Sequence, residues 1–88
     1  MDYEEFEKAV DTLGVLSRLS KKDLKQKYLK LSKRYHPDMP EGSQEKFLEI
    51  KKSYDLLCAY MDSYCFTFEK DEFLQQFPSF TNYKNWNR

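Results

Sequence analysis

The chain has 88 residues and a mass of 10.7 kDa, with 15 lysines and arginines against 15 aspartates and glutamates. This length allows one small domain and excludes the scaffold of most enzymes, so we expect no catalytic activity of the chain's own. A net charge of zero argues against a globally basic nucleic-acid binder, although it does not say where the charges lie.

The first predicted element is an amphipathic helix over about residues 2–13. Its apolar residues recur at steps of three and four: Tyr3, Phe6, Val10 and Leu13. Gly14 follows as a typical C-terminal cap. We expect the apolar residues of the connector after it to join the core: Val15, Leu16 and Leu19.

A second helix is predicted over about residues 21–35, opened by Ser20 and Asp23, which resemble a capping box. Its apolar residues share one face: Leu24, Tyr28, Leu31 and Tyr35. Basic residues occupy most of the remaining circumference: Lys21, Lys22, Lys25, Lys30, Lys33 and Arg34. Pro37 ends the helix, because proline disfavours the helical conformation of the residue before it.

A third helix over about residues 44–61 follows a short loop, with Ser43 as its N-cap. Its apolar stripe contains Phe47, Ile50, Tyr54, Leu57, Cys58 and Met61. Two amphipathic helices joined by one short loop predict an antiparallel hairpin, and therefore an all-α fold.

The C-terminal part is rich in aromatic residues, because nine of the 15 in the chain follow residue 59. A short helix is predicted over about residues 68–77, capped by Thr67 and ended by Pro78. Residues 79–88 read as a polar loop that carries Phe80, Tyr83 and Trp86. Disordered tails are poor in aromatic residues, so we expect this segment to pack.

The cysteines and the histidine are too few for a metal site, and no glycine-rich phosphate loop is present, so we expect neither a metal nor a cofactor. Cys58 and Cys65 would lie about two turns apart on one helix, roughly 10 Å and beyond disulfide reach. We expect both thiols to be reduced and packed.

The N-terminus predicts a soluble, cytoplasmic protein. Its first residues are acidic, whereas a targeting peptide begins with a basic segment. The longest apolar run, residues 56–61, is too short to span a bilayer, so no membrane partner is expected.

Charge is distributed very unevenly along the neutral chain. Residues 20–36 carry seven basic residues and one acidic residue, whereas residues 1–19 and 37–62 each carry a net charge of −3. The basic helix is either a solvated face or a docking surface for an acidic protein or a nucleic acid.

The tripeptide His36-Pro37-Asp38 directly follows this basic helix. Specific motifs surround it: Leu13-Gly14-Val15, then Leu24-x3-Tyr28-x2-Leu31-x3-Tyr35-His36-Pro37-Asp38, then Lys46-Phe47-x2-Ile50-x3-Tyr54-x2-Leu57. Over about residues 3–61 the sequence resembles the J-domain family of DnaJ-like co-chaperones. The resemblance implies a J-domain fold, with the helix hairpin carrying the HPD loop at its tip.

The resemblance also implies a partner, a DnaK-type (seventy-kilodalton heat-shock) chaperone whose ATP hydrolysis is stimulated. By the same resemblance, Asp38 would engage an arginine of the ATPase, which a carboxylate can hold bidentately. Pro37 stiffens the loop, and the His36 ring can donate or accept a hydrogen bond. The basic residues expected to meet an acidic patch of this partner are Lys22, Lys25, Lys30, Lys33 and Arg34.

Three residues depart from the family's usual pattern. Leu29 occupies a position that is usually basic, and it is either a scattered surface leucine or an apolar contact inside the basic patch. Lys27 and Ser53 stand where small alanines are usual, so Lys27 would lay its stem along the hairpin and send its ammonium to solvent.

We therefore divide the chain into a J domain, residues 1–65, and an aromatic-rich extension, residues 66–88. The extension is a candidate surface for a client protein. Two alternatives remain open: a helical module that binds nucleic acid through the basic helix, and a J-like scaffold that acts through its aromatic tail.

Overall fold

The computed structural model describes residues 1–78, which form four helices and no strand. These are α1 (Tyr3–Leu13), α2 (Lys21–Arg34), α3 (Gln44–Asp62) and α4 (Lys70–Gln76). The prediction of an all-α fold is confirmed, and each predicted helix ends within two residues of the observed one. The predicted polar loop with Phe80, Tyr83 and Trp86 lies outside the described residues.

The helix termini follow from capping residues that the sequence shows directly. Both halves of the Ser20–Asp23 capping box are formed at the start of α2. The side chain of Ser43 accepts a hydrogen bond from the Lys46 amide at the start of α3. Gly14 closes α1 with φ 69°, a left-handed conformation that favours glycine.

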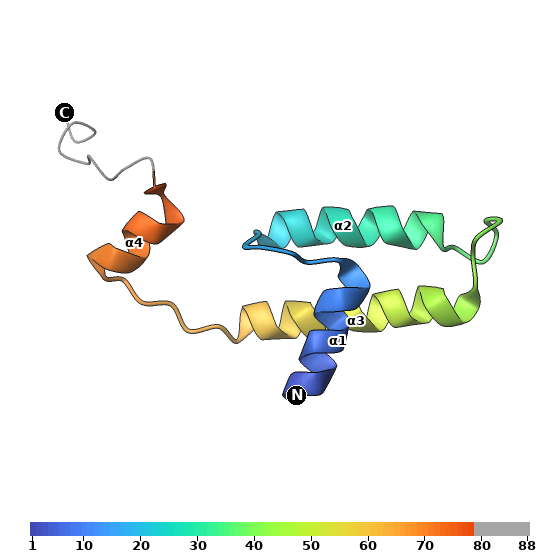
Figure 1. The fold of residues 1–88 in the computed structure, drawn as a ribbon, viewed down its shortest axis with the longest axis horizontal. Coiled ribbons are helices and arrows are strands. Elements are labelled where there is room, and N and C mark those ends of the chain that lie inside the picture. The colour runs from blue at the N-terminus through green and yellow to red at the C-terminus, as the bar shows by residue number, and fades with distance from the viewer. Residues whose placement is uncertain (79–88) are drawn as a thin grey trace.

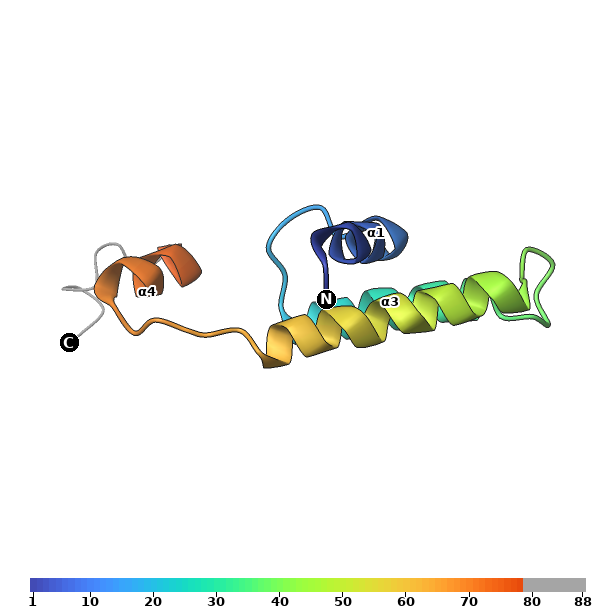
Figure 2. The same cartoon turned by 90° about the horizontal axis from the view of Figure 1, so that it is seen from below.

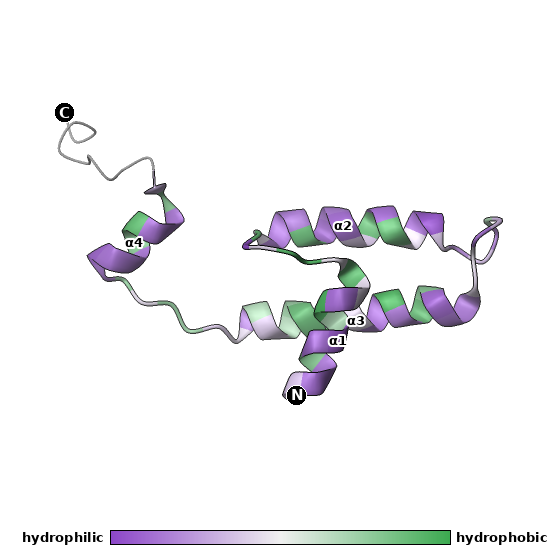
Figure 3. Cartoon of the chain, in the orientation of Figure 1, coloured by the Kyte–Doolittle hydropathy of each residue, from purple (hydrophilic) through white to green (hydrophobic). Residues whose placement is uncertain are grey.

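Helices α2 and α3 form the predicted antiparallel hairpin, and α1 lies across one side of it (Figures 1 and 2). The core is small and draws on all three helices: Ala9, Leu13, Leu24, Ile50 and Leu57 are buried. Between α2 and α3, the rings of Tyr28 and Tyr54 stack with their centroids 4.2 Å apart. Hydrophilic residues make up most of α2, with narrow apolar bands between them (Figure 3).

Leu16 of the connector was wrongly assigned to the core, and Tyr3, on the predicted apolar face of α1, is also exposed. Leu16 is 95% exposed and Tyr3 is 71% exposed. Because α1 ends at Leu13 and the chain then turns toward α2, only Val15 and Leu19 of the connector pack against the core. Tyr3 is the first residue of α1, and the N-terminal end of this helix projects past α3 (Figure 1).

The prediction that both thiols pack is wrong for Cys65, which is exposed. Helix α3 ends at Asp62 with Ser63 as its cap, so Cys65 lies in the following linker and is exposed. Cys58 is half-buried on α3. At the hairpin contact, Ser53 is buried, whereas the Lys27 side chain is exposed.

Helix α4 stands beyond the end of α3, at the end of an extended linker (Figures 1 and 2). It begins at Lys70 with Glu69 as N-cap residue, and Thr67 does not cap it. The expectation that this segment packs is wrong for Phe66 and Phe68, which are 68% and 96% exposed. A short helix on an extended linker has few surfaces against which these rings could be buried.

Candidate functional site

The loop between α2 and α3 is closed by three backbone hydrogen bonds. The Met39 amide donates to the His36 carbonyl at 2.8 Å, and the Gly42 amide donates to the Met39 carbonyl at 2.9 Å. The Ser43 amide then donates to the Tyr35 carbonyl at 3.3 Å, which joins the two ends of the loop. Two successive turns and a closing bond therefore give the loop a defined shape.

Gly42 is necessary for this shape because the backbone comes very close to it. A Cβ atom at this position would lie 1.7 Å from the His36 carbonyl oxygen and 3.0 Å from the Met39 carbonyl oxygen. No side chain fits there without moving the His36 backbone. Sequence analysis gave Gly42 no role, since a close approach between residues six apart leaves no local sequence signal.

His36 and Asp38 are held by this loop and face solvent. The Asp38 amide donates to His36 Nδ1 at 3.2 Å, so the neutral ring carries its proton on Nε2. The His36 and Phe47 rings form a T-shaped pair with their centroids 5.4 Å apart. The Asp38 side chain is 91% exposed, so its carboxylate is open to an incoming basic group.

Arg34 spans the base of the loop. Its Nε donates to Glu41 Oε2 at 3.0 Å, and this hydrogen bond raises the pKa of Arg34. Its guanidinium also lies 5.2 Å from the Tyr35 ring centroid, and Lys46 Nζ lies 4.2 Å from the same centroid. Arg34 therefore braces the loop, and its predicted contact with a partner stays a prediction.

The other four predicted basic residues present free charges. Lys22, Lys25, Lys30 and Lys33 are exposed, and within residues 1–78 none of them forms an ion pair. Lys21 differs, because its Nζ contacts Asp62 Oδ1 at 2.5 Å, and this hydrogen bond raises the pKa of Lys21. The basic face thus combines four unpaired lysines with the adjacent loop.

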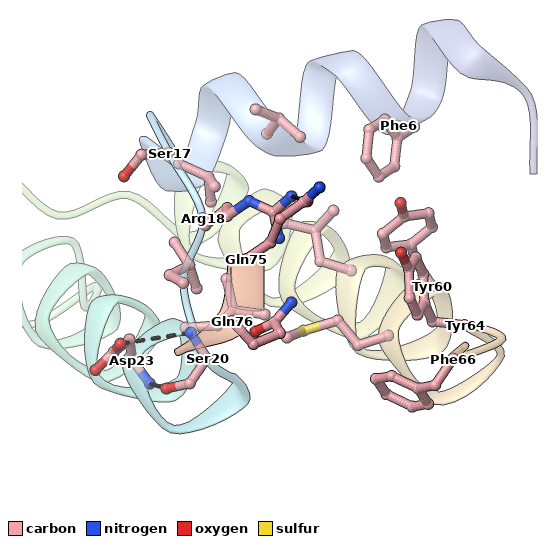
Figure 4. Close-up of a pocket in the computed structure, with 16 residues that line it drawn as sticks. Phe6, Ser17, Arg18, Ser20, Asp23, Tyr60, Tyr64, Phe66, Gln75 and Gln76 are labelled. Carbon is pink, nitrogen blue, oxygen red and sulfur yellow. Dashed lines mark hydrogen bonds between the residues drawn. The ribbon is translucent and has the colours of Figure 1, made fainter. Parts of the chain in front are cut away.

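A second concave feature lies toward the opposite end of α3 from the loop. It is a groove of about 680 Å³ between α1, the connector, the end of α3 and α4 (Figure 4). Four successive ring contacts join the aromatic residues beside it: Tyr3, Phe6, Tyr60, Tyr64 and Phe66. Arg18 Nη2 donates to Gln75 Oε1 at 3.3 Å on the α4 side. Sequence analysis named Tyr3 and Phe6 and counted the other three among the C-terminal aromatic residues, but it missed that all five form one series.

No group of three or more potential metal ligands comes together in residues 1–78. None of the four described helices is both long and apolar enough to cross a bilayer.

The described residues form a small helical domain, in which a hairpin presents the closed HPD loop at its tip and α2 carries four lysines without an ion pair. The family model described as "DnaJ domain" matches residues 9–61 of this chain. The chain therefore belongs to the DnaJ-domain family, as the resemblance predicted.

Bacterial DnaJ proteins are among its relatives. The chaperone protein DnaJ of Staphylococcus carnosus (strain TM300) is 49% identical over 49 residues, which cover 53% of this chain and 13% of that protein. The chaperone protein DnaJ of Staphylococcus aureus (strain JH1) is 47% identical over 49 residues, with the same coverage. The match thus spans about one eighth of the length of these relatives. No solved structure matches the chain significantly.

Proposed function

We propose that this chain is a co-chaperone that binds a DnaK-type chaperone and stimulates its ATP hydrolysis, with no catalytic activity of its own. The observation that carries the proposal is the exposed Asp38 carboxylate on a closed loop that directly follows α2, the helix that carries four lysines without an ion pair. Membership of the DnaJ-domain family supports it. The relatives share only this domain, so the proposal concerns the domain's action alone.

The loop would act by binding one state of the partner more tightly than the other. Asp38 would hold an arginine of the ATPase, and a ligand shifts a two-state equilibrium only by its difference in affinity for the two states. His36 offers Nε2–H as a donor, since its Nδ1 accepts from the Asp38 amide. Pro37 limits the backbone freedom lost on binding.

A steady-state ATPase assay with a bacterial DnaK-type chaperone tests this proposal. The wild-type chain is expected to raise the hydrolysis rate, and Asp38→Asn and His36→Gln are expected to abolish the increase. Asp11→Asn on α1 is the matched control and should stimulate like the wild type. Absence of stimulation by the wild type, or equal stimulation by His36→Gln, would refute the proposal.

The basic face should contribute affinity that falls with salt. Each exposed pair is worth roughly 0.2–1 kcal/mol, so replacing Lys25 and Lys30 together by alanine should weaken chaperone binding about 2- to 30-fold. Titrations at low and physiological salt measure this effect, which should shrink as ionic strength rises. Replacing Lys8 and Lys52 instead should leave the affinity unchanged, and a similar loss there would argue against a localised face.

The unpaired lysines also support a second candidate function, nucleic-acid binding through α2. That function requires salt-sensitive binding to duplex DNA or RNA with a Kd of roughly 10⁻⁴ M or tighter at physiological salt. Nucleic-acid binding would be favoured if the wild type bound in this way, the Lys25/Lys30 variant did not, and the wild type gave no chaperone stimulation. Co-chaperone action instead requires His36 and Asp38, which phosphate binding does not.

We propose residues 66–88 as a separate extension from a J domain of residues 1–65, with exposed aromatic rings that contact a client protein. Phe66 and Phe68 support this, since large exposed apolar side chains close together mark interaction surfaces. Deleting residues 66–88 should leave chaperone stimulation intact and remove client binding. Loss of stimulation on the same deletion would instead place the extension within the chaperone site.

A further inference from the structure

An apolar residue stands at the centre of the basic face of α2. Leu29 is 49% exposed and does not belong to the core or to the residues packed against it. At about 100° per residue, it lies about 140° around the helix from Leu24, which is 1% exposed. On the same basis, Leu29 lies within roughly 40° of Lys22 and Lys33.

The lysines around Leu29 form a charged rim. Its neighbours one turn away on either side are Lys25 and Lys33, and Lys22 and Lys30 complete the rim. Each lysine can lay its methylene stem along the helix while its ammonium stays in water. An apolar centre within a polar rim is the arrangement found in the tightest parts of protein interfaces.

This surface lies close to the HPD loop along the chain. Leu29 precedes Arg34, the last residue of α2, by five residues, or about 7.5 Å along the helix axis, and His36 follows two residues later. A partner that contacts the loop and also the lysines one turn before and after Leu29 therefore covers Leu29 as well.

We propose that Leu29 is an apolar anchor of the chaperone contact, seated in an apolar depression of the partner that is bordered by carboxylates. The inference rests on the proposed co-chaperone function and adds the chemistry of the partner surface. Lys22, Lys25, Lys30 and Lys33 contact the border, and Leu29 fills the centre. A nucleic-acid backbone offers no such depression, because its surface is a regular array of phosphates.

Replacing Leu29 by lysine tests the anchor, because the two interpretations of this face predict opposite changes in affinity for the chaperone. If the face acted only through its charge, Leu29→Lys would add a fifth free lysine, tighten chaperone binding and steepen its salt dependence. If Leu29 is an anchor, the variant has to bury a charge and should bind roughly 5- to 30-fold more weakly. Leu29→Ala should weaken binding with an unchanged salt dependence.

The matched control is Leu48→Lys, because Leu48 is 52% exposed on α3 and lies outside the basic face. Affinity for the DnaK-type chaperone is measured by calorimetric titration at two salt concentrations, with far-ultraviolet circular dichroism to confirm equal helix content. Binding by Leu29→Lys as tight as or tighter than the wild type would overturn the anchor, as would an equal loss in Leu48→Lys. If the wild type stimulates ATP hydrolysis by the chaperone and His36→Gln does not, either of these binding results overturns the Leu29 anchor and leaves the proposed co-chaperone function standing. Absence of wild-type binding overturns both proposals.

Discussion

Replacing Leu24 by alanine is expected to destabilise the domain by about 2–5 kcal/mol. Leu24 is 1% exposed and packs with Ile50 and Leu57 where α2 meets α3. The substitution removes buried apolar atoms and leaves a cavity that the remaining side chains fill only in part. The free energy of unfolding of a native domain is about 5–15 kcal/mol, so this loss is a large fraction of the total. Urea denaturation followed by circular dichroism at 222 nm measures it.

Leu29→Ala is the control for this substitution, since it makes the same chemical change on the same helix. Leu29 is 49% exposed, so we expect its replacement to change the free energy of unfolding by less than about 0.5 kcal/mol. Equal losses at the two positions would mean that the observed packing of α2 on α3 is wrong.

Replacing Gly42 by alanine is expected to abolish chaperone stimulation while the helices remain intact. The new Cβ would lie 1.7 Å from the His36 carbonyl oxygen, so the two loop turns cannot both persist. The substitution is expected to break the backbone hydrogen bonds donated by the Met39 and Gly42 amides, which set the position of His36 and Asp38. A displacement of about 1 Å in a positioned group can cost about 100-fold in rate. The measurement is the ATPase assay, combined with circular dichroism for helix content.

Gly14→Ala is the matched control, because it alters a glycine at a helix end far from the loop. Its Cβ would meet no atom within 4 Å, but the φ of 69° is strained for any residue with a side chain. We expect a loss of about 1–2 kcal/mol in the free energy of unfolding and unchanged stimulation by the folded fraction. If Gly42→Ala retained full stimulation, the closed loop would not be the active conformation.

The loop precedes the first residue of α3, whereas the aromatic groove is lined by residues near the end of that helix, so the two lie toward its opposite ends. If the aromatic extension contacts a client as proposed, the client and the chaperone would therefore occupy separate surfaces of one small domain. Competition between a client and the chaperone for this chain would argue against that arrangement. A binding assay with both partners present measures it.

Local signals were sufficient to predict the helices. Each signal that begins or ends a helix acts within one helical turn of the residues it affects. These signals are the Ser20–Asp23 capping box, the Ser43 cap, the left-handed Gly14 and Pro37. The apolar stripes likewise show which face of α2 and α3 turns inward. The sequence thus predicted the hairpin and placed His36, Pro37 and Asp38 in its loop.

Burial depended on contacts between residues far apart in the chain. Leu16 and Leu19 look alike in the sequence, but only Leu19 packs against the core. Cys65 would continue the pattern of α3, but the helix ends at Asp62 and its cap. Periodicity describes a face of a helix, whereas burial requires a second element to cover that face.

The fine structure of the site was also decided only in three dimensions. By itself the sequence determined the helices, the basic face of α2 and the position of the HPD tripeptide, because these depend on neighbours within a few residues. The tertiary structure decided that Arg34 pairs with Glu41, that four lysines stay free, and that Gly42 has no room for a side chain. These features depend on distances across a folded loop and between helices, which a linear pattern does not encode.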